Sequence, residues 1–322
     1  MMVITTWDFY LGISVDIILK SIMINIMINK IKKLHSISIV IIIVVLLIVC
    51  WFIITKKSIN TPVTSQNAKP THIVTSFCVV NGIVNKLLVG IDNIKKCQLI
   101  NNDVSCPHEY SVCPEDIKRL ENANIFIKLD KTIDSQFDKI VSQIPNLHVI
   151  TICEKDGVHD WLSIDQTIKM ATYIQSKLVI ELPDHKDNII NNLNKYVIEL
   201  QRLKAHLCPK FERFKDISTV TDSEILSVFL KELGLQTILL SDHKEHDEVS
   251  SHDMVKMIQI MRQNQVKLIF TTQNSKTLES LKCEFHNVKI CTLLDKWSEN
   301  SDIATCIEYN INLIIPALEN AV

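Results

Sequence analysis

From residue 71 onward, short apolar runs alternate with longer stretches in which apolar residues recur every three or four positions. Apolar runs of this length predict buried strands, and the longer stretches predict amphipathic helices. The expected strands are 72–77, 125–127, 148–152, 237–240, 266–270 and 288–294. The expected helices include 83–88, 117–123, 132–143, 164–174, 223–233, 254–263, one around 278–281, and 301–319. Such alternation predicts an α/β fold with mainly parallel sheets and flanking helices.

The longest amphipathic stretch divides this pattern into two halves. It opens at Pro183-Asp184, and we expect it to stop at Cys208-Pro209 because proline ends helices. Its apolar stripe comprises Ile189, Leu193, Val197, Leu200, Leu203 and Leu207. At 1.5 Å per residue the helix spans roughly 35–40 Å. It is either an ordinary core helix or a backbone helix that joins two lobes.

The N-terminal part has a different character. Residues 37–55 are almost purely apolar and are followed by Lys56-Lys57, and about 20 such residues span a bilayer. The preceding lysines favour a cytoplasmic leading side. The segment is either an uncleaved signal anchor or a cleaved signal, with Cys50 as a lipidation site in the second case. Because Val49 is larger than the usual residue before a lipidated cysteine, the anchor is favoured.

Residues 1–36 have uncertain status, since Met23 and Met27 offer later starts. Residues 56–70 are polar, contain two prolines and predict a linker. The bulk of the chain is therefore expected to be tethered to the membrane and to face the periplasm or the cell exterior.

The amino-acid composition argues against several classes of function. The 322 residues include only 5 glycines, and neither a P-loop nor a dinucleotide fingerprint is present. The net charge of −2 makes a nucleic-acid partner unexpected. The 10 cysteines form no Cys-x-x-Cys pair, which argues against a zinc ribbon and a thioredoxin-type site.

Two histidines stand in loops before expected helices. His108 precedes the helix start Pro114-Glu115-Asp116, and His159 precedes the helix at 164–174. Ligands of parallel sheets bind outside the carboxyl ends of the strands, and zinc sites draw on scattered histidines and carboxylates. Taken alone, each histidine is more typical of a solvated loop residue.

Five motifs in order resemble the metal-binding solute-binding proteins of zinc and manganese ABC importers, over roughly residues 71–320. They are Pro107-His108-Glu109-Tyr110 with Pro114-Glu115-Asp116-Ile117 and Ala123, then His159-Asp160-Trp161-Leu162, then Phe229 with Leu233-Gly234-Leu235, then Val266-Lys267-Leu268-Ile269-Phe270, and finally Leu293-Leu294-Asp295. The resemblance implies two α/β lobes with a long linker helix: a first lobe at 71–183, the linker helix at 184–209 and a second lobe at 210–322.

The resemblance also implies a function and a site. Proteins of this family capture one divalent metal ion in the cleft between the lobes and deliver it to a membrane permease. By position, His108, His159 and Asp295 match three ligands, and Ser223 stands at the third-ligand position, flanked by Asp222 and Glu224. Since serine is a poor zinc ligand, a neighbouring carboxylate or water is expected there. Zn²⁺ is the expected cargo, and a site with two carboxylates also suits Mn²⁺.

Three other features have competing interpretations. His243, His246 and His252, with Glu245 and Asp247, form either an auxiliary metal-collecting loop or a solvated turn, and Ser251-His252-Asp253 resembles a helix cap. Cys106 and Cys113 flank His108 and are either a disulfide, a thiolate contribution to the site, or free thiols. Trp161 is expected to be a core anchor beneath His159.

Two other functions compete with a transport receptor. One is a metal-dependent enzyme, because three protein ligands and an open position suit catalytic zinc. The absence of an HExxH base motif argues against it, and we expect no catalysis. The other is a surface or adhesion protein of the same descent with a degraded metal site.

Overall fold

The computed structural model describes residues 69–101, 104, 107, 110–153, 160–240, 250–273, 276–297 and 301–321, and residues 23, 27, 30, 44–48 and 51 nearer the N-terminus. The chain divides into two compact units, Met1–Ala68 and Lys69–Val322. In the first unit, residues 44–48 are helical and exposed. Among the described residues, no helix combines the length and apolar character needed to cross a bilayer. The expected anchor at 37–55 lies mainly outside these residues.

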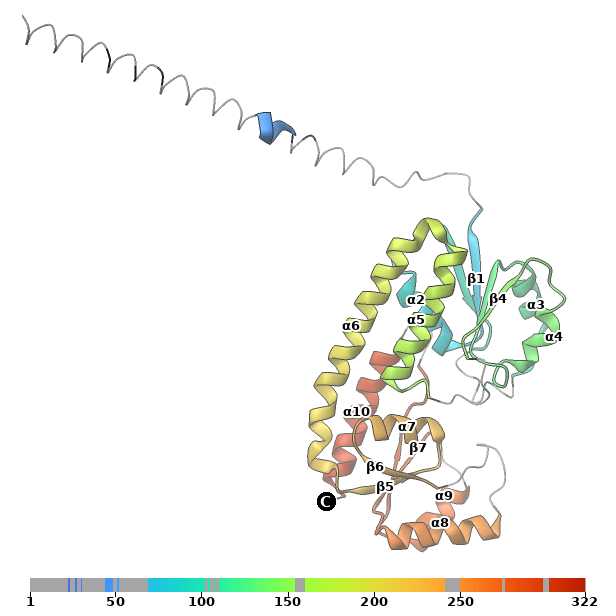
Figure 1. Ribbon diagram of the computed structural model, residues 1–322. Coiled ribbons are helices and arrows are strands. Elements are labelled where there is room, and N and C mark those ends of the chain that lie inside the picture. The colour runs from blue at the N-terminus through green and yellow to red at the C-terminus, as the bar shows by residue number, and fades with distance from the viewer. Residues whose placement is uncertain are drawn as a thin grey trace, which may run out of the picture. The chain divides into compact units, whose positions relative to one another are not determined.

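The second unit contains two sheets of the same design (Figure 1). The first sheet has strands β1 (Thr71–Thr75), β2 (Ile94–Gln98), β3 (Ile125–Lys128) and β4 (His148–Thr151), in the order β2-β1-β3-β4. The second has β5 (Ser218–Thr221), β6 (Gln236–Leu239), β7 (Leu268–Thr271) and β8 (Lys289–Thr292), in the order β6-β5-β7-β8. All six strand pairings are parallel, which confirms the predicted fold class of two α/β lobes.

Helices connect and cover the sheets. They are α2 (Cys78–Leu87), α3 (Pro114–Glu121), α4 (Asp138–Val141), α5 (Ile164–Glu181), α6 (Lys186–Phe211), α7 (Glu224–Glu232), α8 (Ser251–Gln263), α9 (Lys276–Glu284) and α10 (Ile303–Glu319), with 3₁₀ turns η2 (Ser135–Phe137), η3 (Pro183–His185) and η4 (Glu212–Phe214). Helix α6 runs alongside both lobes, with α5 and α10 beside it (Figure 1). Helix α7 ends as expected at Gly234, whose φ of +90° suits glycine.

The structure differs from the local predictions at several places. Strand β2 was not predicted, because Lys95 and Lys96 are exposed and break the apolar pattern of this edge strand. Helix α6 continues through Pro209 to the buried Phe211, whose packing outweighs the one backbone bond that proline removes near the helix end. Helix α8 already begins at Ser251, because Ser250 caps it by accepting from the Asp253 amide. The helix expected at 132–143 is reduced to η2 and α4.

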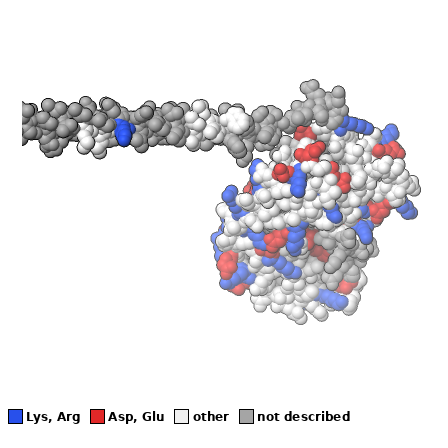
Figure 2. All heavy atoms as spheres, turned by 45° about the horizontal axis from the view of Figure 1, so that its top comes forward, with Lys and Arg blue, Asp and Glu red and all other residues white. Residues whose placement is uncertain are grey.

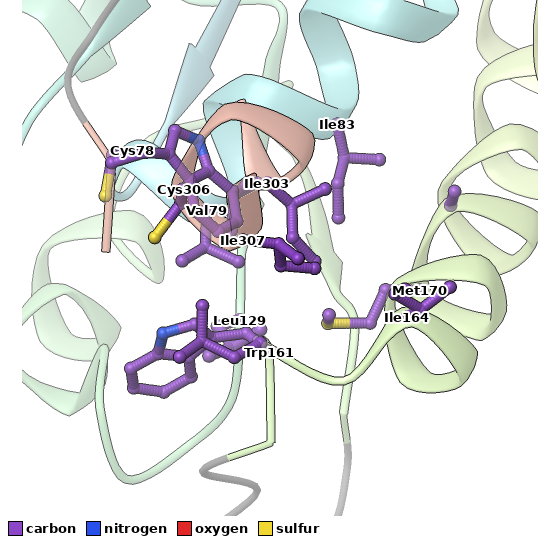
Figure 3. Packing of buried hydrophobic residues seen from close by; sticks show 14 of the residues in the cluster. Cys78, Val79, Ile83, Leu129, Trp161, Ile164, Met170, Ile303, Cys306 and Ile307 are labelled. Atoms are coloured by element: carbon purple, nitrogen blue, oxygen red, sulfur yellow. The ribbon is translucent and has the colours of Figure 1, made fainter. Parts of the chain in front are cut away.

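One hydrophobic core is shared by both lobes. It includes residues of β1, β3 and α2 from the first lobe, of α5 and α6, and of α7, β7 and α10 from the second. Figure 3 shows part of it, where Cys78 and Val79 lie close to Cys306, Ile303 and Ile307 of α10, above Leu129 and Trp161. A smaller cluster around Met257 and Met261 fills the space between the second sheet and α8.

Two lysine-centred clusters reinforce the junction. Lys204 of α6 pairs with Asp165 of α5 at 2.6 Å and with Glu232 of α7 at 2.8 Å. The Glu232 carboxylate also accepts hydrogen bonds from the first amides of α5, at 2.9 and 3.2 Å, and so caps that helix across the junction. Lys86 of α2 pairs with Glu199 of α6 at 2.9 Å and with Asp302, the N-cap of α10, at 2.8 Å.

The lobes approach each other closely at Gly82. A Cβ atom there would lie 2.7 Å from Nε1 of Trp297 and 3.3 Å from Cε2. Both residues are buried, so the indole has little room to retreat. We predict that Gly82→Ala lowers the free energy of unfolding by about 1–3 kcal/mol through overpacking, although alanine is the better helix former. Urea titration measures the change, and Trp297→Phe in the same chain should restore part of it.

A buried carboxylate pair lies at the end of β3. Asp130 and Asp134 are both fully buried, and each accepts backbone hydrogen bonds: Asp130 from the amides of Thr132 and Ile133, and Asp134 from the Leu129 amide. Burial raises the pKa of Asp134 to about 7, against the lowering contributions of the Leu129 amide, Ser76 and Lys128. This carboxyl therefore holds a proton in the folded protein at pH values where the unfolded chain has lost it.

The pH dependence of stability follows from this shift. Because the folded pKa lies above the unfolded value of about 3.9, the contribution of Asp134 to stability is lost as pH rises from about 4 to about 7. We predict that Asp134→Asn removes this loss, on the order of 2 kcal/mol between pH 5 and pH 8. Unfolding free energies at the two pH values test it, with the exposed Asp184→Asn as control. An unchanged slope in Asp134→Asn would contradict the prediction.

Candidate metal-binding site

The candidate residues all follow strands at their carboxyl ends. His108 and His159 lie in the connections after β2 and β4, and both are outside the described residues. Asp222 follows β5, and Asp295 follows β8. In a parallel sheet these ends share one edge, which is where such folds bind ligands.

The described residues near His108 are held by hydrogen bonds. The Pro107 carbonyl accepts from Nε2 of Gln136 at 3.2 Å. The Tyr110 hydroxyl donates to the Asp116 carboxylate at 2.7 Å, and Asp116 also accepts from the Cys113 amide at 3.0 Å. Burial and the Asp116 carboxylate raise the pKa of Tyr110, which therefore stays a hydrogen-bond donor. The Pro107 backbone is thus bonded to η2, and the Tyr110 side chain is bonded to α3.

Trp161 anchors the segment that follows His159. Its side chain is buried, as predicted, and packs edge-on against Phe77 with ring centroids 5.7 Å apart. Its indole Nε1 donates to the Asp295 carbonyl at 2.6 Å. This bond crosses from the first lobe to the second, and it brings the His159 connection to the backbone of the predicted carboxylate ligand.

Asp295 occupies a short segment with well-defined supports. The preceding residue, Leu294, exchanges two hydrogen bonds of 2.8 Å with the side-chain amide of the fully buried Asn310. The next residue, Lys296, donates from Nζ to the Val104 carbonyl, in the connection that carries His108. Burial raises the pKa of Asp295, and the Lys296 ammonium partly offsets this shift.

At the third-ligand position, the structure distinguishes three neighbouring residues. Ser223 is the N-cap of α7 and is buried, and its Oγ accepts from the Leu226 amide at 3.4 Å. Glu224 is exposed in the first helical turn. Asp222 is half-buried at the sheet edge, where its Oδ2 accepts from the Thr271 hydroxyl at 3.2 Å. The Ser223 hydroxyl therefore already serves the helix cap, while Asp222 places a half-buried carboxylate at the sheet edge.

Within the described ranges, no group of three or more His, Cys, Asp or Glu side chains is close enough together to hold a metal ion. Of the histidine loop, residues 241–249 lie outside those ranges, and His252 is exposed. Cys113 is an exposed free thiol, and Cys106, its partner in the disulfide alternative, lies outside the described residues.

The supports of the site were not predicted from the sequence. Gln136, Lys296 and Asn310 act through contacts with residues distant in the chain, and no motif marked them. The only available signal was the position of Lys296 next to a predicted ligand. Figure 2 shows Lys, Arg, Asp and Glu side chains intermixed over the visible face, in keeping with the near-neutral net charge.

Comparison with known proteins gives a consistent picture. The family profile described as zinc-uptake complex component A, periplasmic, matches residues 73–314, more than half of the chain. The manganese-binding lipoprotein MntA of Halalkalibacterium halodurans is 22% identical over 233 residues, which cover 68% of this chain and 77% of that protein. The zinc-binding lipoprotein AdcA of Streptococcus pneumoniae is 21% identical over 230 residues, which cover 63% of this chain but only 45% of AdcA.

Solved structures show the same fold. The Zn(II)-bound ZnuA-like domain of Streptococcus pneumoniae AdcA superposes with a TM-score of 0.62 at 20% identity, covering 78% of this chain and 99% of that domain. A Mn-bound periplasmic metal-binding protein (S38A mutant) from Candidatus Liberibacter asiaticus gives a TM-score of 0.67 at 17% identity, covering 77% of this chain and 99% of the other. The chain therefore belongs to the family of the periplasmic component A of zinc-uptake complexes.

Proposed function

We propose that this protein is a solute-binding protein that captures a divalent transition metal between its lobes and delivers it to an ABC importer permease. The cargo is Zn²⁺, and Mn²⁺ also fits the donor set. Its ligands are His108, His159 and Asp295, with Asp222 at the third-ligand position in place of Ser223. The family assignment and the metal-binding relatives support this function.

One observation supports the location of the proposed metal site. The segment around Asp295 bonds to both connections that carry the histidines, through Trp161 for His159 and through Val104 for His108. Described residues of the two connections, Trp161 and Val104, are thus bonded to the segment that contains Asp295, which supports a shared site. Two imidazoles and two carboxylates neutralise a divalent cation, and the oxygen ligands broaden the choice from Zn²⁺ toward Mn²⁺.

The ion is cargo rather than a catalyst in this proposal. Family relatives are components of metal transporters, and the chain lacks an HExxH base motif. Ligands from two lobes can coordinate the same ion only when the lobes have one particular relative position. Metal binding therefore stabilises that arrangement, which the permease can recognise. The apolar segment 37–55 tethers the lobes to the membrane, on its periplasmic or outer face.

The first test is metal titration of the full chain in mild detergent, with Zn²⁺ and Mn²⁺. We predict one-to-one binding that raises the melting temperature by several degrees at a metal concentration of about 100 Kd, equivalent to about 2.7 kcal/mol. His108→Ala and Asp295→Asn should each weaken binding at least tenfold, while His286→Ala, at an exposed position outside every candidate site, should not. Equal affinity in all four proteins would place the metal elsewhere, and the loop at 241–249 would be examined next.

The second test separates the residues at the third-ligand position. Ser223→Ala removes a helix cap, so it should cost about 1 kcal/mol of stability and leave metal affinity unchanged. Asp222→Asn keeps the shape and removes the charge, so it should weaken metal binding at least tenfold. Glu224→Gln in the exposed first turn is the matched carboxylate control. If Glu224→Gln weakens binding and Asp222→Asn does not, Glu224 is the ligand.

A further inference from the structure

Residues 293–297, here called the aspartate segment, join the second lobe to the first through two side-chain donors. Trp161 of the first lobe donates its indole N–H to the Asp295 carbonyl at 2.6 Å. In the opposite direction, Lys296 donates its ammonium to the Val104 carbonyl. The two bonds start from different lobes, and each ends on a backbone carbonyl.

The aspartate segment is itself fixed to its own lobe. Asn310 of α10 is fully buried and holds both the amide and the carbonyl of Leu294. Cys306, also on α10, donates its thiol toward the Lys296 carbonyl at 3.6 Å. At its end, Trp297 instead packs against Gly82 of α2, in the first lobe. Movement of the Asp295 backbone relative to α10 would break several of these contacts at once.

We propose that Trp161 and Lys296 are positioning residues that fasten the two lobes together at the metal site and thereby set its affinity. This inference rests on the proposed function. Neither side chain is a ligand; each holds the backbone of a connection that supplies one. Trp161 aligns the His159 connection with Asp295, and Lys296 aligns the His108 connection with the same segment.

The physical argument is preorganisation. A metal site built from separate connections binds tightly only if its ligands are already near their final positions. Without a bond between them, the connections sample wider arrangements, and the ion must restrict them on binding. The loss should appear mainly as faster metal release. Because the bonds share one segment, removing the second after the first should cost less than removing it alone.

The experiment compares variants of the full chain. Trp161→Phe keeps an aromatic ring against Phe77 and removes the N–H donor. Lys296→Met keeps the length of the side chain and removes its ammonium, and Lys296→Arg retains a cationic donor. Lys289→Met is the matched control, because Lys289 also donates to a backbone carbonyl, that of Asn320 at 3.1 Å, but within the second lobe. Zinc affinity, zinc release rate and metal-free melting temperature are measured for each.

We expect Trp161→Phe and Lys296→Met each to weaken zinc binding roughly tenfold and to speed release by a similar factor. The double variant should lose less than a hundredfold, Lys296→Arg should bind within about threefold of the unaltered chain, and Lys289→Met should bind unchanged. The proposal is overturned if the loss of zinc affinity in every variant, including Lys289→Met, is proportional to the fall in melting temperature. In that case Trp161 and Lys296 only stabilise the fold.

Two further outcomes separate this inference from the proposed function. Unchanged zinc affinity in both single variants, with tight binding by the unaltered chain, would overturn the positioning role alone. Absence of zinc and manganese binding by the unaltered chain would overturn the proposed function, and the positioning role with it.

Discussion

The sharing of one hydrophobic core between the lobes is the constraint on which the rest of the structure depends. Trp161 comes from the first lobe and Trp297 from the second, and both are buried in the same cluster. Exposing a tryptophan costs about 4–6 kcal/mol at the usual 25 cal/mol per Å² of apolar surface. A wide opening of the lobes would expose both, together with neighbours on α2 and α10. Cargo binding and release must therefore proceed by small tilts or by rearrangement of the connections.

Electrostatics strengthens this constraint at two places along α6. Lys204 holds α5 and α7 together, and Lys86 of α2 holds α6 and the start of α10. The Glu232 carboxylate contributes most at this junction, because it is only 11% exposed and caps α5 as well as pairing with Lys204. The exposed pair Arg213–Glu319 at the far end of α6 contributes little by comparison. The interactions of greatest value are thus concentrated where the lobes meet.

The sequence predicted those features whose cause is local. Strands such as β3 and β7 are buried on both faces and therefore appear as apolar runs, and Pro114 and Gly234 mark helix ends by their own geometry. Strand β2 was missed because an edge strand can carry lysines. The candidate ligands followed from motifs, but their supports did not. Asn310 appears as an unremarkable helix residue until the fold brings it to Leu294.

At the third-ligand position, the need to cap helix α7 and the chemistry of metal binding fall on neighbouring residues. A helix that begins at the end of a strand needs a cap, and a buried serine satisfies it with a neutral hydroxyl. Ser223 performs that role, and its hydroxyl oxygen already accepts from the Leu226 amide. The carboxylate that remains at this edge is Asp222, one residue nearer the strand and already bonded to Thr271. In the proposed site, a carboxylate at this position supplies a negative charge and a hard oxygen donor. Such a site would depend less on strict tetrahedral nitrogen geometry, and its selectivity for Zn²⁺ over Mn²⁺ would depend more on how firmly the surrounding connections are held.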